Sequence, residues 1–186
     1  MPRIHVCSLA RVPHTVAETG ASHLVTLINL GTPVERPASI AAERHLFLGI
    51  NDIIEPMEGM IHPAEEHVAT LLDFVRGWNQ EKPIVVHCFA GISRSTAAAF
   101  ITLCALRPER DETEIAAQIR KLSPPATPNL LLVRLADHVL GRGGRMVSAI
   151  EAIGRGHEAF EGHPFALTLQ QDSSTPSLMS SATMRS

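Results

Sequence analysis

A cysteine and an arginine six positions apart are the two residues in this sequence with the clearest chemical meaning. Cys88 ends a short apolar run, and an Ala-rich stretch follows Arg94 and Ser95. This order predicts a buried strand, a tight loop and a helix. The loop between them consists of Phe89, Ala90, Gly91, Ile92 and Ser93. Backbone N–H groups of such a loop at a helix N-terminus point inward and bind an anion, so the pattern predicts a phosphate-binding loop that needs no lysine.

The chemistry expected of this loop is nucleophilic attack on phosphorus. The helix dipole and the loop amides favour the thiolate form of Cys88, which is the nucleophilic form. Arg94 can bind two phosphate oxygens with its guanidinium fork, and with the loop amides it would hold the equatorial oxygens in the transition state. The Ser95 hydroxyl can stabilise the thiolate when it leaves. Strand alternation turns His87 away from the phosphorus, so we expect it to order the loop by hydrogen bonding.

His87, Cys88, Arg94 and Ser95, with Gly91 inside the loop, resemble the signature of the cysteine-dependent protein tyrosine phosphatase superfamily. The resemblance is to its compact dual-specificity branch in particular. It implies a general-acid aspartate on an upstream loop, and Asp52 stands thirty-six positions before Cys88, after an apolar run. Asp52 would protonate the departing oxygen and then accept a proton from the water that hydrolyses a phosphocysteine.

The resemblance also implies a Pro-Asn pair at the start of a downstream helix, where the asparagine helps to hold the phosphate loop. Pro128 and Asn129 match that pair. About the first 140 residues follow the family's pattern. The sequence departs from it in having no tyrosine and in the helix expected after Arg142.

Each of these roles has a simpler alternative. Glu55 is the other candidate general acid, and Asp52 could serve only to turn its loop. Ser95 could be a hydroxyl that satisfies a helix N-terminus, and the same holds for Ser93. The sequence leaves these alternatives open.

The other thiols and the histidines suggest neither a redox pair nor a metal site. Cys104 is expected about 15 Å along the helix that begins near Arg94, beyond the reach of a disulfide to Cys88. We interpret Cys104 and Cys7 as packing residues, although the sequence leaves a redox role for Cys7 open. His62 and His67 do not share a helix face, and no cysteine or histidine cluster has zinc spacing. No metal or cofactor is expected.

Strand-like and helix-like segments alternate along the chain. Strands are predicted over residues 4–8, 23–29, 45–50 and 83–88, and helices over 63–78, 95–106, 111–122, 129–140 and 145–153. This order predicts an α/β fold in which helices cover both faces of a small, mainly parallel sheet. We expect a catalytic domain over residues 1–161 and a Ser/Thr-rich disordered tail over 162–186.

Composition limits the partners and the location. Sixteen Lys and Arg against nineteen Asp and Glu give a net charge of −3, so neither nucleic acid nor a membrane surface is the expected partner. Three cysteines are no disulfide framework, and no apolar stretch reaches the length of a signal or membrane segment. These features favour a cytoplasmic protein, and its oligomeric state is left open.

The function predicted is phosphomonoester hydrolysis on a phosphorylated protein or peptide, at tyrosine or with dual specificity, through a phosphocysteine. Two alternatives use the same anion loop: a sulfurtransferase or arsenate-reductase-like enzyme, and a phosphate-reading module with weak turnover. The variable loop positions Phe89, Ala90 and Ile92 include no lysine, so nothing supports an inositol phosphate as substrate. A nucleotide or RNA 5′-phosphate is left open.

Overall fold

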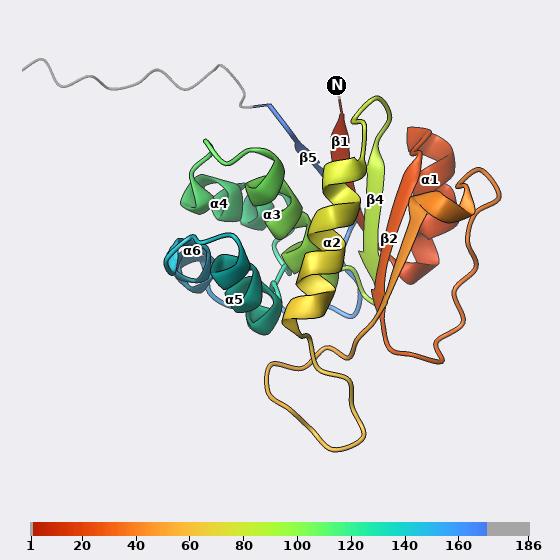
Figure 1. Cartoon of the computed structure of the whole chain (residues 1–186). Coiled ribbons are helices and arrows are strands. Elements are labelled where there is room, and N and C mark those ends of the chain that lie inside the picture. Colours follow the sequence, from red (N-terminus) through yellow and green to blue (C-terminus); the bar gives the residue numbers. More distant parts are fainter. Residues whose placement is uncertain (1, 171–186) are drawn as a thin grey trace, which may run out of the picture.

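A mainly parallel sheet organises the computed structural model, which describes residues 2–170 (Figure 1). The strand order is β3-β2-β4-β1-β5. The first four of these pair in parallel, whereas β5 runs antiparallel to β1 at the edge. The strands are β1 (Arg3–Ser8), β2 (His23–Ile28), β3 (His45–Gly49), β4 (Ile84–Cys88) and β5 (Phe165–Thr168).

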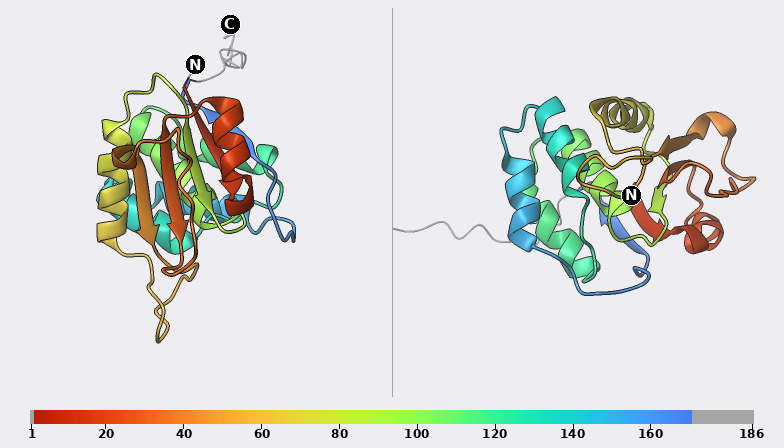
Figure 2. Two further views of the ribbon diagram at one scale, coloured as in Figure 1. Left: turned by 90° about the vertical axis from the view of Figure 1, so that its right-hand side faces the viewer. Right: turned by 90° about the horizontal axis from the view of Figure 1, so that it is seen from below.

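Helices cover both faces of the sheet, as the sequence predicts (Figure 2). Helix α1 packs on β1 and β4 from one side, and α2 and α3 lie on the other. Helices α4 and α5 pack on α3, and α6 packs on both of them as an outer layer. The helices are α1 (Val12–Thr19), α2 (Glu65–Gly77), α3 (Arg94–Leu106), α4 (Glu112–Leu122), α5 (Leu130–Val139) and α6 (Arg145–Ile153).

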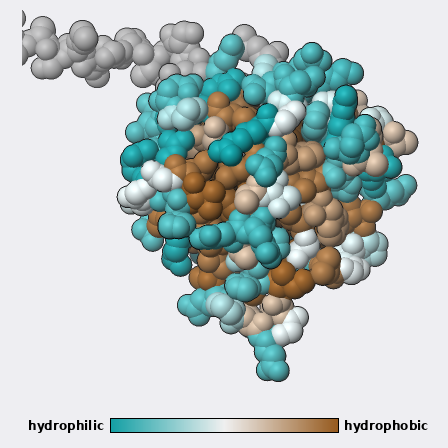
Figure 3. All heavy atoms as spheres, viewed as in Figure 1, coloured by the Kyte–Doolittle hydropathy of each residue, from teal (hydrophilic) through white to brown (hydrophobic). Residues whose placement is uncertain are grey.

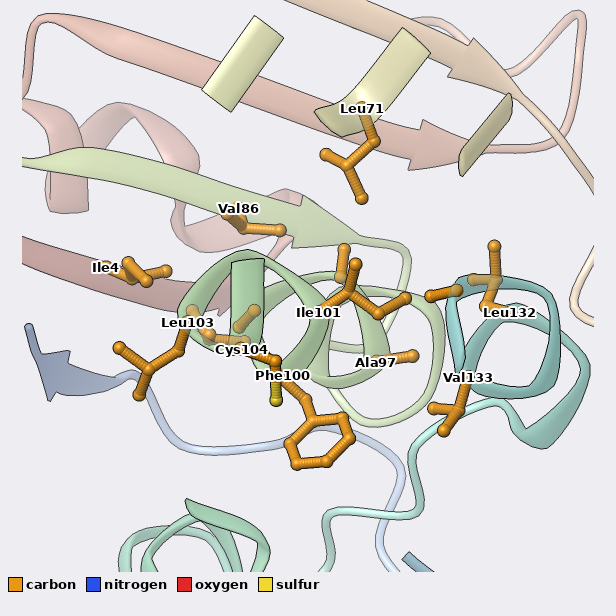
Figure 4. Packing of buried hydrophobic residues seen from close by; sticks show 14 of the residues in the cluster. Ile4, Leu71, Val86, Ala97, Phe100, Ile101, Leu103, Cys104, Leu132 and Val133 are labelled. Carbon is orange, nitrogen blue, oxygen red and sulfur yellow. The ribbon is translucent and has the colours of Figure 1, made fainter. Parts of the chain in front are cut away.

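Helix α3 lies at the centre of the larger core. Small side chains at Ala97, Ala98 and Ala99 let neighbouring elements approach it closely, and all three are fully buried. Figure 4 shows Ala97 and Ile101 directed toward α5, with β4 and β1 on another side of the helix. A helix that is apolar all round is expected to be enclosed in this way, and the enclosure fixes the position of the loop that precedes α3.

Two elements were missed by the sequence predictions. Helix α1 is short, and β5 lies inside residues 162–186, which were predicted to form a disordered tail. That prediction is wrong for β5, because Phe165, Leu167 and Leu169 are buried and the strand pairs with β1. Their alternation has the period of a strand but is short and adjoins a Ser/Thr-rich stretch. Residues 171–186 lie outside the described part of the chain.

The topology brings four loops to one edge of the sheet. The parallel strands β1, β2, β3 and β4 all end at the lower edge in Figure 1. Loops at the carboxyl ends of parallel strands are the usual position of ligand sites in such folds. Ser8, Asn29, Asp52 and Cys88 lie at or just beyond these ends. Within residues 2–170, none of the helices has the length and apolar character that a membrane span requires.

Candidate active site

The loop between β4 and α3 has its carbonyl groups turned outward. Three of them accept hydrogen bonds from backbone amides of other segments, which come from the end of β1, the stretch before β5 and the turn before α5. The pairs are Leu9 N–H to Phe89 O (3.1 Å), Gly162 N–H to Ala90 O (2.9 Å) and Thr127 N–H to Ile92 O (2.9 Å). Because a peptide's N–H and C=O point in opposite directions, the amides of this loop face its interior. The result is an anion-binding nest at the start of α3.

Gly91 is required by the tight packing of this loop. Its φ of 74° lies in the left-handed region. A Cβ atom there would stand 2.8 Å from the carbonyl carbon of Cys7 and 2.9 Å from the amide nitrogen of Ser8. Any other residue would push the loop away from β1, so the backbone of the loop is held against the sheet.

Cys88 lies at the base of the nest with two polar groups directed at its sulfur. The Gly91 N–H donates to Sγ at 3.3 Å, and the Ser95 Oγ lies 3.2 Å from Sγ. Cys88 and Ser95 are buried, and α3 begins at Arg94. The amide, the hydroxyl and the helix N-terminus all stabilise a negative charge on the sulfur.

Arg94 is held on one side and free on the other. Its Nη1 donates to Asn29 Oδ1 (2.7 Å) and to the Ile50 carbonyl (2.8 Å). The side chain is 6% exposed, and Nε has no hydrogen-bond partner among residues 2–170. An orphaned buried donor of this kind calls for a ligand. The edge formed by Nε and Nη2 is therefore available for two oxygens of an anion.

Asn29 and Ile50 are site residues that the sequence analysis missed. Neither has reactive chemistry, and the Ile50 contribution is a backbone carbonyl, which leaves no trace in a sequence. The available signal was topological, because both follow parallel strands that end at the same edge as β4.

Asp52 lies at the free edge of Arg94. Its Oδ1 accepts hydrogen bonds from Ser93 Oγ (2.7 Å) and Asn129 Nδ2 (2.9 Å), and its Oδ2 lies 3.9 Å from Arg94 Nε. The carboxylate is 37% exposed, so it is open to a substrate. Within the described contacts none joins Glu55 to Arg94 or Cys88.

Asn129 connects three segments of the site. Its Oδ1 accepts from the Leu132 N–H and caps α5, and its Nδ2 donates to Asp52 and to the Ile53 carbonyl. Its own N–H donates to the Ser93 carbonyl at 3.3 Å. This asparagine joins the phosphate loop to the aspartate loop, a wider connection than the loop support expected from the sequence.

His87 lies on the opposite face of β4 from Cys88 and is fully buried. Its Nδ1 is 3.1 Å from the Cys88 carbonyl, and because a carbonyl can only accept, Nδ1 carries the proton. Burial lowers the pKa of His87 to about 4, so the ring is neutral. The Thr26 hydroxyl must then donate to Nε2 (2.7 Å), and it accepts from His45 Nε2 (2.8 Å).

The other two thiols are enclosed in the cores. Burial raises the pKa of both Cys7 and Cys104 to about 12, so both stay protonated. Cys7 is opposite His87 in the β1–β4 register and belongs to the cluster beneath α1. Its side chain therefore points to the face away from Cys88. Among residues 2–170, no group of three or more His, Cys, Asp or Glu side chains is arranged to hold a metal ion.

Two hollows adjoin the phosphate loop. A smaller one, of about 350 Å³, lies between Arg94, Asn29, Thr32 and Phe89. A larger groove, of about 810 Å³, starts at Asp52 and Ser93 and runs between the loop after β3 and the turn before α5. Arg94 lines the smaller hollow, and the larger groove begins beside it, at Asp52 and Ser93.

A family model of protein-tyrosine phosphatases matches residues 58–124. The matched segment contains α2, β4, the phosphate loop, α3 and α4. It begins after Asp52 and ends before Asn129. The positions of these two residues at the site thus come from the structure. No curated protein matches the sequence.

Several solved structures share the fold. The PTP-2 phosphatase of Cydia pomonella is 19% identical with a TM-score of 0.57, over 73% of this chain and 84% of that chain. The human tyrosine phosphatase-like serine/threonine/tyrosine-interacting protein is 17% identical with a TM-score of 0.59, over 75% and 92%. The Yvh1 phosphatase domain from Chaetomium thermophilum is 20% identical with a TM-score of 0.52, over 77% and 93%.

Proposed function

We propose that this chain, a hydrolase of the cysteine-dependent protein tyrosine phosphatase superfamily, removes phosphate from phosphotyrosine and other phosphorylated side chains of proteins through a phosphocysteine intermediate. One observation carries the proposal. A buried cysteine sulfur lies at the base of an amide-lined loop, and the arginine that ends this loop has a buried Nε without a hydrogen-bond partner, with the Asp52 carboxylate 3.9 Å away. This arrangement fits a tetrahedral phosphate dianion, whose oxygens the loop amides and the guanidinium bind while the sulfur attacks phosphorus.

In the first step the Cys88 thiolate attacks phosphorus, and the bond from phosphorus to the ester oxygen breaks. The loop amides and Arg94 hold the other three oxygens, where negative charge accumulates. Asp52 gives its proton to the departing oxygen. That proton resides on Oδ2, because Oδ1 already accepts two hydrogen bonds, and Oδ2 is the oxygen nearer to Arg94.

In the second step a water molecule attacks the phosphocysteine. Asp52, now a carboxylate, accepts a proton from that water, the bond between sulfur and phosphorus breaks, and inorganic phosphate leaves. The thiolate that departs accepts a hydrogen bond from the Ser95 hydroxyl, 3.2 Å away. Each turnover therefore consumes one water and regenerates the thiolate, and it needs no cofactor.

The same mechanism bears on location and on the alternatives. Turnover requires a reduced Cys88, which fits the cytoplasm inferred from the cysteine content. An arsenate reductase that resolves its intermediate within the chain needs a second thiol near the nucleophile. Cys104 is buried in the larger core, and Cys7, although it lies on the strand next to β4, is buried on the other face of the sheet in the cluster beneath α1, where its pKa is raised to about 12. This arrangement favours hydrolysis over thiol-dependent reduction.

The decisive experiment replaces the nucleophile. Cys88→Ser should lower kcat on 4-nitrophenyl phosphate by about 10⁴-fold or more, since the hydroxyl is a far weaker nucleophile at neutral pH. Calorimetric titration with inorganic phosphate should still show binding, because the amides and Arg94 remain. Cys104→Ala, which removes a thiol from the core, serves as the matched control and should retain wild-type kcat at a temperature where it is folded.

Three outcomes would contradict the proposal. Turnover of Cys88→Ser near the wild-type rate would rule out a phosphocysteine intermediate. A wild-type burst of one equivalent without further turnover would indicate a phosphate-reading module. Faster reaction with thiosulfate or arsenate than with the aryl phosphate would indicate the sulfurtransferase or arsenate-reductase-like alternative.

A further inference from the structure

The loop after β3 is closed at its base, which we call its neck, by two hydrogen bonds between its first and last residues. The Asn51 N–H donates to the Ile61 carbonyl at 2.7 Å, and the Ile61 N–H donates to Asn51 Oδ1 at 2.9 Å. Between these two residues the chain makes no helix or strand. Loops whose ends meet in this way are compact and are frequently functional. We call residues 51–61 the acid loop, and Figure 1 shows it protruding from the lower edge of the domain.

The acid loop exposes apolar side chains toward the larger groove. Ile54 and Met57 line that groove and are 56% and 54% exposed, although side chains of this size are usually buried. Pro128 and Leu130 contribute apolar surface from the facing wall. Brown spheres gather at the lower edge of the molecule beside the base of the loop (Figure 3).

The charges along this groove have one sign. Asp52, Glu55 and Glu58 belong to the acid loop, which contains no lysine or arginine. Glu55 lines the groove, and the facing residues 127–130 carry no charge. The groove therefore offers an apolar floor with the Glu55 carboxylate at its edge, and Glu58 lies three positions further along the acid loop. An additional phosphate or carboxylate placed there would be repelled.

The groove also has a fixed relation to the reaction. It starts at Asp52 and Ser93, which are hydrogen-bonded to each other at 2.7 Å, and Asp52 adjoins the free edge of Arg94. Asp52, the proposed general acid, must face the ester oxygen of a bound phosphorylated side chain. Of the two hollows, this groove is the one that Asp52 lines, so it is the one that the segment of substrate next to the phosphorylated residue can enter from that oxygen.

We propose that this groove selects phosphopeptides in which an apolar residue and a lysine or arginine flank the phosphorylated residue. The inference rests on the proposed function and names a substrate class for that site. The apolar residue covers Ile54 and Met57, and the basic residue pairs with Glu55 and Glu58. A polyphosphorylated lipid headgroup has the opposite charge to the one this groove favours.

The test is a panel of matched phosphotyrosine peptides. Each has an alanine and leucine background, and a single lysine or a single glutamate is placed in turn at the two positions on either side of phosphotyrosine. We expect kcat/KM of the best lysine peptide to exceed that of its glutamate counterpart about 10-fold at low salt, because two partly shielded charge pairs form. The preference should shrink in 0.5 M NaCl.

The variant is the double substitution Glu55→Gln and Glu58→Gln. The ratio between lysine and glutamate peptides should fall to about 2-fold, and comparing two peptides within one variant cancels any change in its basal rate. Glu109→Gln is the matched control, since Glu109 is exposed beyond the far end of α3. Its ratio should equal that of the wild type. Met57→Ser should raise KM for the leucine peptides while kcat stays constant, the sign of lost uniform binding.

The outcomes separate this proposal from the one it rests on. If the wild type fails to hydrolyse 4-nitrophenyl phosphate, the proposed function fails. If it hydrolyses that compound but shows equal or higher kcat/KM on glutamate peptides, only the groove proposal is overturned. Faster hydrolysis of phosphoinositide in phosphatidylcholine vesicles than of any peptide would overturn it as well.

Discussion

The phosphate loop and the acid loop contribute to one site but are held in opposite ways. The phosphate loop, residues 88–94, is bounded by the fully enclosed helix α3 and by β4, and its carbonyls are bonded to three other segments. The acid loop is closed by two hydrogen bonds at its neck, and most of its residues between Asn51 and Ile61 are exposed. Its carboxylate is tied to the rest of the site by hydrogen bonds from Ser93 and Asn129 and by an ion pair with Arg94 at 3.9 Å.

The difference separates two demands of the chemistry. Holding the charge of a transition state needs dipoles that are already in place and do not reorganise. A general acid must instead exchange protons with substrate and water in turn, so it needs access to solvent. The molecule meets the first demand with the buried phosphate loop and the second with the exposed acid loop. Substitutions in the two loops should therefore change activity by different amounts and in different ways.

The largest loss is expected from Arg94→Lys in the phosphate loop. Lysine has one ammonium group, so it cannot keep the bonds of Nη1 to Asn29 and Ile50 and also present a fork to phosphate. We expect kcat/KM on 4-nitrophenyl phosphate to fall about 10³-fold. Arg76→Lys, exposed on α2, is the matched control. A loss under 10-fold would mean that the loop amides alone hold the anion.

A loss of about 10²-fold is expected from Asp52→Asn, and it should depend on the leaving group. Asparagine keeps an oxygen for Ser93 and Asn129 but has no proton to give. The loss in kcat should therefore be larger with phenyl phosphate than with 4-nitrophenyl phosphate, whose leaving group needs little protonation. Asp73→Asn, exposed on α2, is the control. An equal loss in kcat with both substrates, or a larger loss in Glu55→Gln than in Asp52→Asn, would mean that Asp52 is not the general acid.

The same contrast explains which parts of the site could be predicted from the sequence. Cys88, Arg94, Ser95 and Gly91 were found because the loop is contiguous and each residue type has a distinct chemical use. The groups that complete the phosphate loop, Leu9 N–H and Gly162 N–H, are backbone amides from distant segments. The type of a residue does not indicate that its backbone amide has such a role, so these two groups could be identified only from the structure.

The fold was predictable to a similar extent. The parallel strands and α3 are nearly continuous apolar runs, and α2, α4, α5 and α6 have an apolar periodicity long enough to recognise. All of them lie within two residues of their predicted bounds. Strand β5 has only four residues, and its stability comes from pairing with β1 rather than from its own composition. Tertiary pairing of this kind overrides local propensity, which is why a disordered tail was wrongly extended over it.

A smaller effect is expected at the neck of the acid loop. Asn51→Ala removes the acceptor of the Ile61 N–H but leaves the bond from Asn51 N–H to the Ile61 carbonyl. Asp52 would spend less time at Arg94, so kcat should fall about 10-fold with the phosphate affinity unchanged. Asn51→Asp keeps the acceptor and should recover most of the activity.

Asn79→Ala provides the matched control for this substitution, because Asn79 also accepts a backbone hydrogen bond, in a turn at the opposite edge of the sheet. If Asn51→Ala lowers phosphate affinity as strongly as kcat, the two loops are not independent. The comparison between a rigid and a loosely held region would then be wrong.

The smallest effect in activity is expected from Thr26→Val beneath the phosphate loop. The bond from His87 Nδ1–H to the Cys88 carbonyl orients the first peptide of the loop, and the Thr26 hydroxyl holds the ring from its other side. Without that hydroxyl the peptide is less well aligned toward an anion. We expect kcat/KM to fall about 3- to 5-fold and the acidic limb of its pH profile to move to higher pH. Thr26→Ser keeps the donor and should restore both.

The pH dependence of unfolding tests the same residue independently of activity. The pKa of His87 is lowered to about 4 by burial, whereas an unfolded histidine titrates near 6.5. The unfolded chain therefore binds more protons between these values, and the free energy of unfolding should fall as pH drops from about 6.5 toward 4, by at most about 3 kcal/mol. In His87→Gln this contribution to the fall in the free energy of unfolding with decreasing pH should vanish. A wild-type slope equal to that of His87→Gln would mean that the ring is charged in the folded protein and that its bond to the loop does not depend on a neutral tautomer.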